Sequence, residues 1–183
     1  DCSNGAYSKI AKLALNNYKT VQFINDKPNG TNINYRCGAL EPENILNLVR
    51  KQNYDYGIAF DGDGDRAIFV GSKYGIIETE KLIVLFSEML HNENSNKTVV
   101  STEICNKGLE KNLEKLGYKL IQTEVGDKYV VNSTLKNDAI LGAEPSGHYF
   151  SPKKSKSMDG LIAVFHFLEL LHIYGDELKK HLK

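Results

Sequence analysis

Three aspartates stand at alternate positions, Asp61, Asp63 and Asp65, with a glycine after each of the first two. Short runs rich in apolar, β-branched and aromatic residues cover 56–60 and 67–70, which predicts a strand, a sharp loop and a second strand. Two unit negative charges about 4 Å apart repel by about 4 kcal/mol at an effective dielectric constant near 20, so the loop needs a compensating charge. Because hard divalent cations prefer oxygen ligands, the spacing predicts a divalent-cation site.

Three other interpretations fit this loop less well. An EF-hand needs glycine at its sixth position and glutamate at its twelfth, where this chain has Arg66 and Ser72. Residues 62–67 match the G-x-G-x-x-A dinucleotide pattern, but Asp63 and Asp65 would repel a pyrophosphate, and a strand rather than a helix is expected to follow. A solvated acidic turn remains the plain alternative, which the third aspartate and the adjacent arginine disfavour.

A second polar group, Glu144, Ser146 and His148, follows a predicted strand and is flanked by Gly142 and Gly147. In an extended loop, alternation would place the three side chains on one side. Together they offer hydrogen-bond donors and acceptors, which the hydroxyls of a hexose require. An ordinary capped turn with a satisfied histidine is the alternative. A serine hydrolase is disfavoured because no G-x-S-x-G motif surrounds the serine.

Two further stretches carry charge without a clear assignment. Gly126-Asp127-Lys128 is expected to open a helix after a strand, and a helix N-terminus beside a cation suits an anion such as phosphate. Asp127 could equally be a plain N-cap. The lysine-rich segment 152–156 is either solvated surface or a loop that faces phosphate.

Several of these motifs, in this order, resemble the α-D-phosphohexomutase family, and within it the phosphoglucosamine mutases. The resemblance runs through nearly the whole chain and rests on DCSNGA at 1–6, PNGTNIN at 28–34 with Gly38, DGDGDR at 61–66, VGDKYV at 125–130 and GAEPSGH at 142–148. Several motifs in one order are far more specific than any one of them.

The resemblance implies an enzyme that interconverts glucosamine 6-phosphate and glucosamine 1-phosphate through a phosphoserine and a bisphosphorylated sugar. It implies that Mg²⁺ is held by the three aspartates of the loop, with Arg66 steadying the phosphoryl group or the neighbouring carboxylates. Glu144 and Ser146 would hold sugar hydroxyls, His148 would lie near the reacting phosphate, and Lys128 would contact phosphate.

The chain departs from the family pattern in ways that limit this expectation. Many members have arginine at Lys128, so the phosphate contact of this lysine is expected to be weaker than theirs. Many also have lysine at Glu124, so the charge that would face phosphate there is reversed in this chain. Neither the phosphoserine loop of the family's first domain nor the phosphate-gripping loop of its last domain is found. The chain is therefore expected to correspond to the two middle domains, to need the flanking domains of the same protein as partners, and to be inactive alone. A phosphomannomutase, a phosphoglucomutase and a non-catalytic module that binds a cation and a sugar phosphate remain the rival hypotheses.

Composition bounds the remaining possibilities. The 183 residues have zero formal net charge and 41% apolar residues, so no global field favours nucleic acid or an anionic membrane as a partner. Three scattered cysteines show no metal-binding spacing and suit a reducing cytoplasm, which is the expected location.

Hydrophobic periodicity predicts an α/β fold with two successive α/β units and mostly parallel sheets. The resemblance implies that these are two α/β/α domains, residues 1–91 binding metal and residues 92–183 binding sugar. A short polar stretch, 92–97, is taken as the join. Helices are predicted at 78–91, 105–116, 127–135 and 159–171. A further helix is predicted at 6–18, with Ile10, Leu13 and Ala14 at helical spacing, and another from Pro42 onward, with Ile45, Leu46 and Val49 as its buried stripe. Strands are predicted at 20–24, 56–60, 67–70, 98–101, 119–122 and 139–142.

Overall fold

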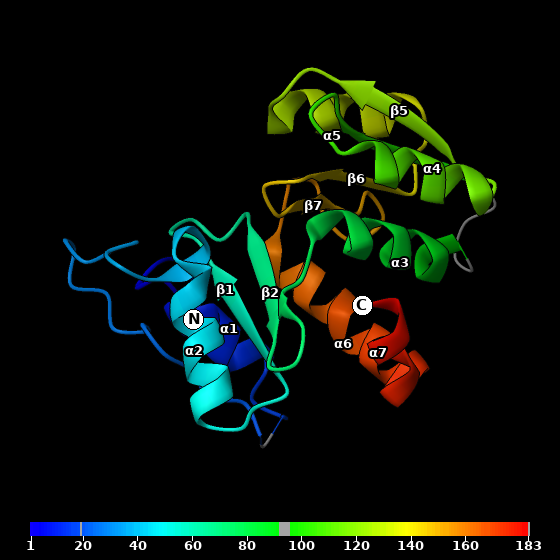
Figure 1. The fold of residues 1–183 in the computed structure, drawn as a ribbon. Helices are drawn as coiled ribbons and strands as arrows, with labels where there is room; N and C mark the ends of the chain where they lie inside the picture. The colour runs from blue at the N-terminus through cyan, green and yellow to red at the C-terminus, as the bar shows by residue number, and fades with distance from the viewer. Residues whose placement is uncertain (19, 92–95, 183) are drawn as a thin grey trace. The chain divides into compact units, whose positions relative to one another are not determined.

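The computed structural model describes residues 1–18, 20–91 and 96–182, and it confirms the α/β fold class (Figure 1). The chain forms two compact units, Asp1–Ile77 and Glu78–Lys183. In the described parts of the chain, no helix combines the length and apolarity needed to cross a membrane.

The first unit is built on an antiparallel sheet of order β1-β2-β3, so the mostly parallel sheet predicted for this unit is wrong. Helix α2 packs on this sheet through Ile45, Leu46 and Val49, as the sequence predicted, and these side chains meet Ala59 and Val70 of the strands. The elements of this unit are α1 (Tyr7–Ala14), a 3-10 helix (Gly38–Leu40), α2 (Pro42–Lys51), β1 (Tyr56–Phe60), β2 (Ala67–Gly71) and β3 (Gly75–Ile76).

Strands β1 and β2 form a hairpin whose last pair is Phe60 opposite Ala67. The six residues between them, 61–66, are therefore the connection of the hairpin, and we call them the acidic loop. The predicted order of strand, loop and strand is confirmed.

Near the N-terminus the structure corrects two predictions. The helix is shorter than the predicted 6–18, and two residues of its predicted apolar face, Ile10 and Leu13, are 48% and 74% exposed. Ala11 and Leu15 are buried instead. Residues 20–24 do not form a strand, although the carbonyl of Ile24 accepts a hydrogen bond from the backbone N–H of Cys2 at 3.0 Å.

The second unit contains a four-stranded sheet of order β5-β4-β6-β7. Strand β4 is parallel to β5 and β6, and β7 is antiparallel to β6. Helix α5 packs on one face, and α3, α4 and α6 contact the sheet or each other on the other side (Figure 1). The elements are α3 (Thr79–His91), β4 (Thr98–Thr102), α4 (Lys107–Lys115), β5 (Lys119–Thr123), α5 (Asp127–Lys136), β6 (Leu141–Glu144), β7 (His148–Phe150), α6 (Gly160–Tyr174), a 3-10 helix (Gly175–Glu177) and α7 (Leu178–His181).

Helix α3 belongs to the second unit, so the structure divides the chain after Ile77 rather than after residue 91. The ring of Phe86 in this helix lies 5.4 Å from that of Tyr149, and the hydroxyl of Tyr118 donates to the carbonyl of Ser87 at 3.0 Å. The join was predicted at 92–97 because this stretch is polar. Polarity alone does not indicate which unit the preceding helix, α3, packs on. Residues 92–95 of that join lie outside the described residues.

Candidate functional site

The acidic loop brings the three aspartates together. One carboxylate oxygen from each of Asp61, Asp63 and Asp65 lies within 4.8 Å of the others. Asp61 is buried, Asp65 is half-buried and Asp63 is exposed, so the group opens toward solvent on one side.

Asp61 fixes the shape of the loop from inside. Its Oδ1 accepts hydrogen bonds from the backbone N–H groups of Gly64 and Arg66, both at 3.2 Å. Gly64 has a φ of 86°, which a residue with a side chain rarely adopts, and this conformation explains the second glycine of the loop. The buried aspartate therefore holds the turn as well as contributing one oxygen to the carboxylate cluster.

Arg66 supplies a positive charge beside two of these carboxylates. Its Nε donates to Oδ2 of Asp61 at 2.6 Å and lies 3.9 Å from Oδ1 of Asp65. Burial raises the pKa of Asp61, but the hydrogen bonds from the side chain and backbone of Arg66 outweigh it and leave that pKa below its ordinary value. Arg66 thus keeps Asp61 ionised and oriented.

The loop residues fit a hard divalent cation. All three donors are carboxylate oxygens, which Mg²⁺ and Ca²⁺ prefer. One oxygen of each carboxylate lies within 4.8 Å of the others, so Asp61, Asp63 and Asp65 are the residues that would hold such a cation.

Replacing Arg66 by methionine should lower the free energy of unfolding at neutral pH in cation-free buffer, because the ionised Asp61 loses its partner. The folded pKa of Asp61 is lowered, so this stabilisation is present above the unfolded pKa and disappears as the pH falls through the folded value. Urea unfolding at about pH 7 and about pH 3 measures the difference.

Arg50→Met is the matched control, since the Nε of Arg50 donates only to a backbone carbonyl, that of Ser72, at 3.1 Å. Its effect should not depend on the carboxylate. A cost of Arg66→Met that is as large in acid as at neutral pH would contradict the assigned ion pair.

The second polar group lies in the other unit, at the turn between β6 and β7. Glu144 and His148 face each other across the strand pair, and Nδ1 of His148 lies 2.9 Å from Oε2 of Glu144. The same nitrogen lies 2.8 Å from Oγ of Ser146. The structure therefore brings these three residues together, as the sequence analysis expected.

The geometry that brings them together differs from the expected extended loop. The N–H of Gly147 donates to the carbonyl of Glu144 at 3.0 Å, and Gly147 has a φ of 94°, so the connection is a tight turn. His148 opens a three-residue strand, β7, that the sequence analysis did not predict. Pro145, Ser146 and Gly147 are typical turn residues and could have indicated this hairpin.

Glu144 is also tied to the start of α5. Its Oε1 accepts a hydrogen bond from the N–H of Gly126 at 3.1 Å, and the residue is 5% exposed. Gly126 is the N-cap of this helix, so the plain N-cap alternative for Asp127 is wrong. The Nζ of Lys128 lies 4.7 Å from the ring centroid of Tyr129. The hydrogen bond from Gly126 to Glu144 therefore joins the stretch predicted to face phosphate, 126–128, to the group predicted to face the sugar, at the carboxyl end of β6.

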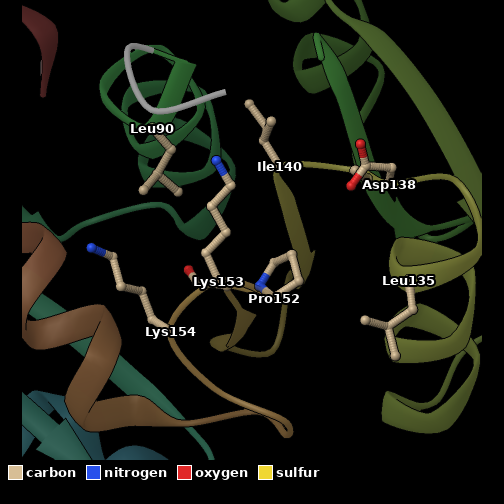
Figure 2. Close-up of a pocket in the computed structure, with 9 residues that line it drawn as sticks. Leu90, Leu135, Asp138, Ile140, Pro152, Lys153 and Lys154 are labelled. Carbon is tan, nitrogen blue, oxygen red and sulfur yellow. The ribbon is translucent and has the colours of Figure 1, made fainter. Parts of the chain in front are cut away.

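The lysine-rich segment lies elsewhere in the second unit. Lys153 and Lys154 line a pocket of about 250 Å³ together with Leu90 and Ile140, and Figure 2 shows the side chain of Lys153 rising between them. Ile140 precedes β6 and Glu144 ends it, so this pocket is at the opposite end of the strand.

The sequence analysis gave no role to several residues that hold the acidic loop. The N–H of Ala6 donates to the carbonyl of Gly62 at 2.8 Å, and a Cβ on Gly5 would lie 2.2 Å from the same oxygen. Both residues belong to the first segment of the family resemblance, which was the available signal.

Family sequence models cover nearly the whole chain. The phosphoglucomutase/phosphomannomutase α/β/α domain II matches residues 1–75, and α/β/α domain III of the same family matches residues 78–183. The chain belongs to this family and contains its second and third domains, whose limits agree with the two compact units.

Curated relatives are named more specifically, as phosphoglucosamine mutases. The phosphoglucosamine mutase of Thermodesulfovibrio yellowstonii is 38% identical over 188 residues, and that of Bacillus subtilis is 39% identical over 183 residues. These matches cover 100% and 98% of this chain but 42% and 41% of the relatives. The chain thus spans about two fifths of the length of these mutases.

Solved structures share the fold at lower identity. A phosphoglucomutase/phosphomannomutase family protein from Burkholderia thailandensis has a TM-score of 0.88 and 24% identity, over 100% of this chain and 42% of that protein. An N-acetylphosphoglucosamine mutase from Aspergillus fumigatus, in complex with GlcNAc-6P and magnesium, has a TM-score of 0.64 and 19% identity over 91% of this chain and 41% of that protein.

Proposed function

We propose that the chain supplies the cation-binding and sugar-binding domains of a phosphoglucosamine mutase, which interconverts glucosamine 6-phosphate and glucosamine 1-phosphate. The observation that carries the proposal is the hairpin loop with three carboxylate oxygens within 4.8 Å of one another. The name of the curated relatives supports the choice of glucosamine phosphate.

In this proposal Asp61, Asp63 and Asp65 hold Mg²⁺, which when bound neutralises charge on the phosphoryl oxygens during transfer. The A. fumigatus structure with magnesium supports the choice of metal. Arg66 acts on the site by keeping Asp61 ionised and aimed, through the 2.6 Å hydrogen bond. It also offers guanidinium N–H groups to a phosphoryl group near the loop.

The sugar is proposed to bind at the turn between β6 and β7. Glu144 is buried and charged, so it suits a sugar hydroxyl donor, while the exposed Ser146 can donate or accept. His148 contacts both and would lie next to the reacting phosphate. Lys128, on the first turn of α5, would contribute charge toward phosphate.

The phosphoryl donor is proposed to be a phosphoserine in another domain of the whole protein. Its phosphoryl group passes to one sugar oxygen. The bisphosphorylated sugar then reorients, and the phosphoryl group at the other sugar position passes back to the serine. Positioning both ends of the substrate also requires those domains. The 183-residue chain alone is therefore expected to be inactive.

Turnover by the whole protein tests this proposal. With Mg²⁺ and a hexose bisphosphate primer, kcat/KM should be highest for glucosamine 6-phosphate, compared with glucose 6-phosphate and mannose 6-phosphate, as followed by phosphorus NMR. The isolated chain should give no 1-phosphate above the blank. A clear preference for either of the other sugars would replace the proposed substrate, and turnover by the isolated chain would overturn the domain assignment.

A further inference from the structure

Ser3 and Asn34 pack together behind the acidic loop. The Oγ of Ser3 lies 2.9 Å from the carbonyl oxygen of Phe60, the residue directly before Asp61, and 3.0 Å from Oδ1 of Asn34. The N–H of Asn34 donates to the carbonyl of Ser3 at 2.9 Å. Ser3 has no exposed surface and Asn34 is half-buried, so the contact of Ser3 with the Phe60 carbonyl is shielded from water.

The same pair borders the backbone between the first two aspartates. A Cβ on Gly62 would lie 2.7 Å from Nδ2 of Asn34 and equally close to the side chain of Ile33. On another side, the carbonyl of Gly62 accepts the hydrogen bond from Ala6. The peptide units that set the separation of the first two carboxylates are therefore held from two directions.

The backbone of both residues indicates that their side chains are needed. Ser3 has a φ of 54° and Asn34 a φ of 57°, in the left-handed region that glycine adopts more readily. Such conformations are strained and persist where surrounding contacts require them. Glycine would adopt these backbone angles with less strain. The contacts of the serine hydroxyl and the asparagine amide therefore explain why serine and asparagine occupy the two positions.

We infer that Ser3 and Asn34 are positioning residues that set the divalent-cation affinity of the acidic loop. Three carboxylates in one loop repel one another before a cation binds, and a backbone free to move would spread them apart. The Ser3–Asn34 pair fixes the chain at Phe60 and Gly62, so the ligand oxygens stay within 4.8 Å. This inference rests on the proposed cation-binding role of the loop.

The variants Ser3→Gly and Asn34→Gly test it, because each removes the side chain while keeping a residue that accepts positive φ. Calorimetric titration of the purified protein with Mg²⁺ and with Mn²⁺ should show at least about fivefold weaker binding for each variant. The double variant should lose little more, since the two residues act as one unit. Asn137→Ala is the control, because the Nδ2 of Asn137 donates at 2.8 Å to the carbonyl of Ser133 in the other unit.

Melting temperatures in EDTA separate positioning from plain stabilisation. Unchanged cation affinity in the single variants that fold, even with lowered melting temperatures, would overturn the inference. If one variant does not fold, the other decides. If Asp63→Asn weakens cation binding but these variants do not, only the positioning role fails. If Asp63→Asn also leaves affinity unchanged, the acidic loop is not the cation site and the proposed function fails with it.

Discussion

Asp63→Asn in the whole protein should lower kcat by at least about a hundredfold, which corresponds to about 2.7 kcal/mol of transition-state stabilisation. Asp63 is exposed and contributes one of the three clustered oxygens, so its charge is available to a cation. Without cation, the substitution removes a repulsive charge from the loop. The melting temperature in EDTA should therefore stay the same or rise.

Asp55→Asn is the matched control, since Asp55 is an exposed aspartate of the same unit outside the loop. It should leave kcat and the melting temperature in EDTA unchanged. An Asp63→Asn variant with normal kcat at saturating Mg²⁺ would contradict the role of this carboxylate in the site.

Glu144→Gln should lower kcat/KM by at least about tenfold, since about 1.4 kcal/mol is one decade. The amide keeps an oxygen that can accept from Gly126, so the fold around the helix start is retained. It loses the negative charge that His148 contacts at 2.9 Å and that a sugar hydroxyl would meet. Hydrogen bonds to charged groups contribute about 1.5–3 kcal/mol, which is enough for the expected loss.

Cation affinity should be unaffected by Glu144→Gln, because the acidic loop belongs to the other unit. Glu110→Gln, an exposed glutamate of α4, is the control for charge loss in the same unit. A variant with a lowered melting temperature and normal kcat/KM would show that Glu144 only holds the turn and the start of α5.

The acidic loop could be predicted closely from sequence because its signal is local. Apolar strands directly flank it, and the glycines and aspartates alternate without interruption. Helix α2 was equally clear, since Pro42 begins it and its buried residues keep helical spacing. In both cases one short stretch contains both the chemistry and the structure.

Predictions failed where the fold depends on distant partners. Ile10 and Leu13 suggested a buried face, but the helix is buried through Ala11, whose small side chain allows close packing. Strand β7 was missed because it has three residues and begins with the polar His148. The backing of the acidic loop by Ser3 joins residues far apart in sequence, which periodicity does not detect.

The most direct test of the account is to titrate the purified 183-residue chain with Mg²⁺, and with Mn²⁺ as a second probe, beside its Asp63→Asn variant. The account predicts one divalent-cation site in the unmodified chain. Binding should be at least about tenfold weaker in the variant, or about 1.4 kcal/mol, because one of three carboxylates loses its charge. Equal affinity of the two proteins would contradict the assignment of the acidic loop as the cation site.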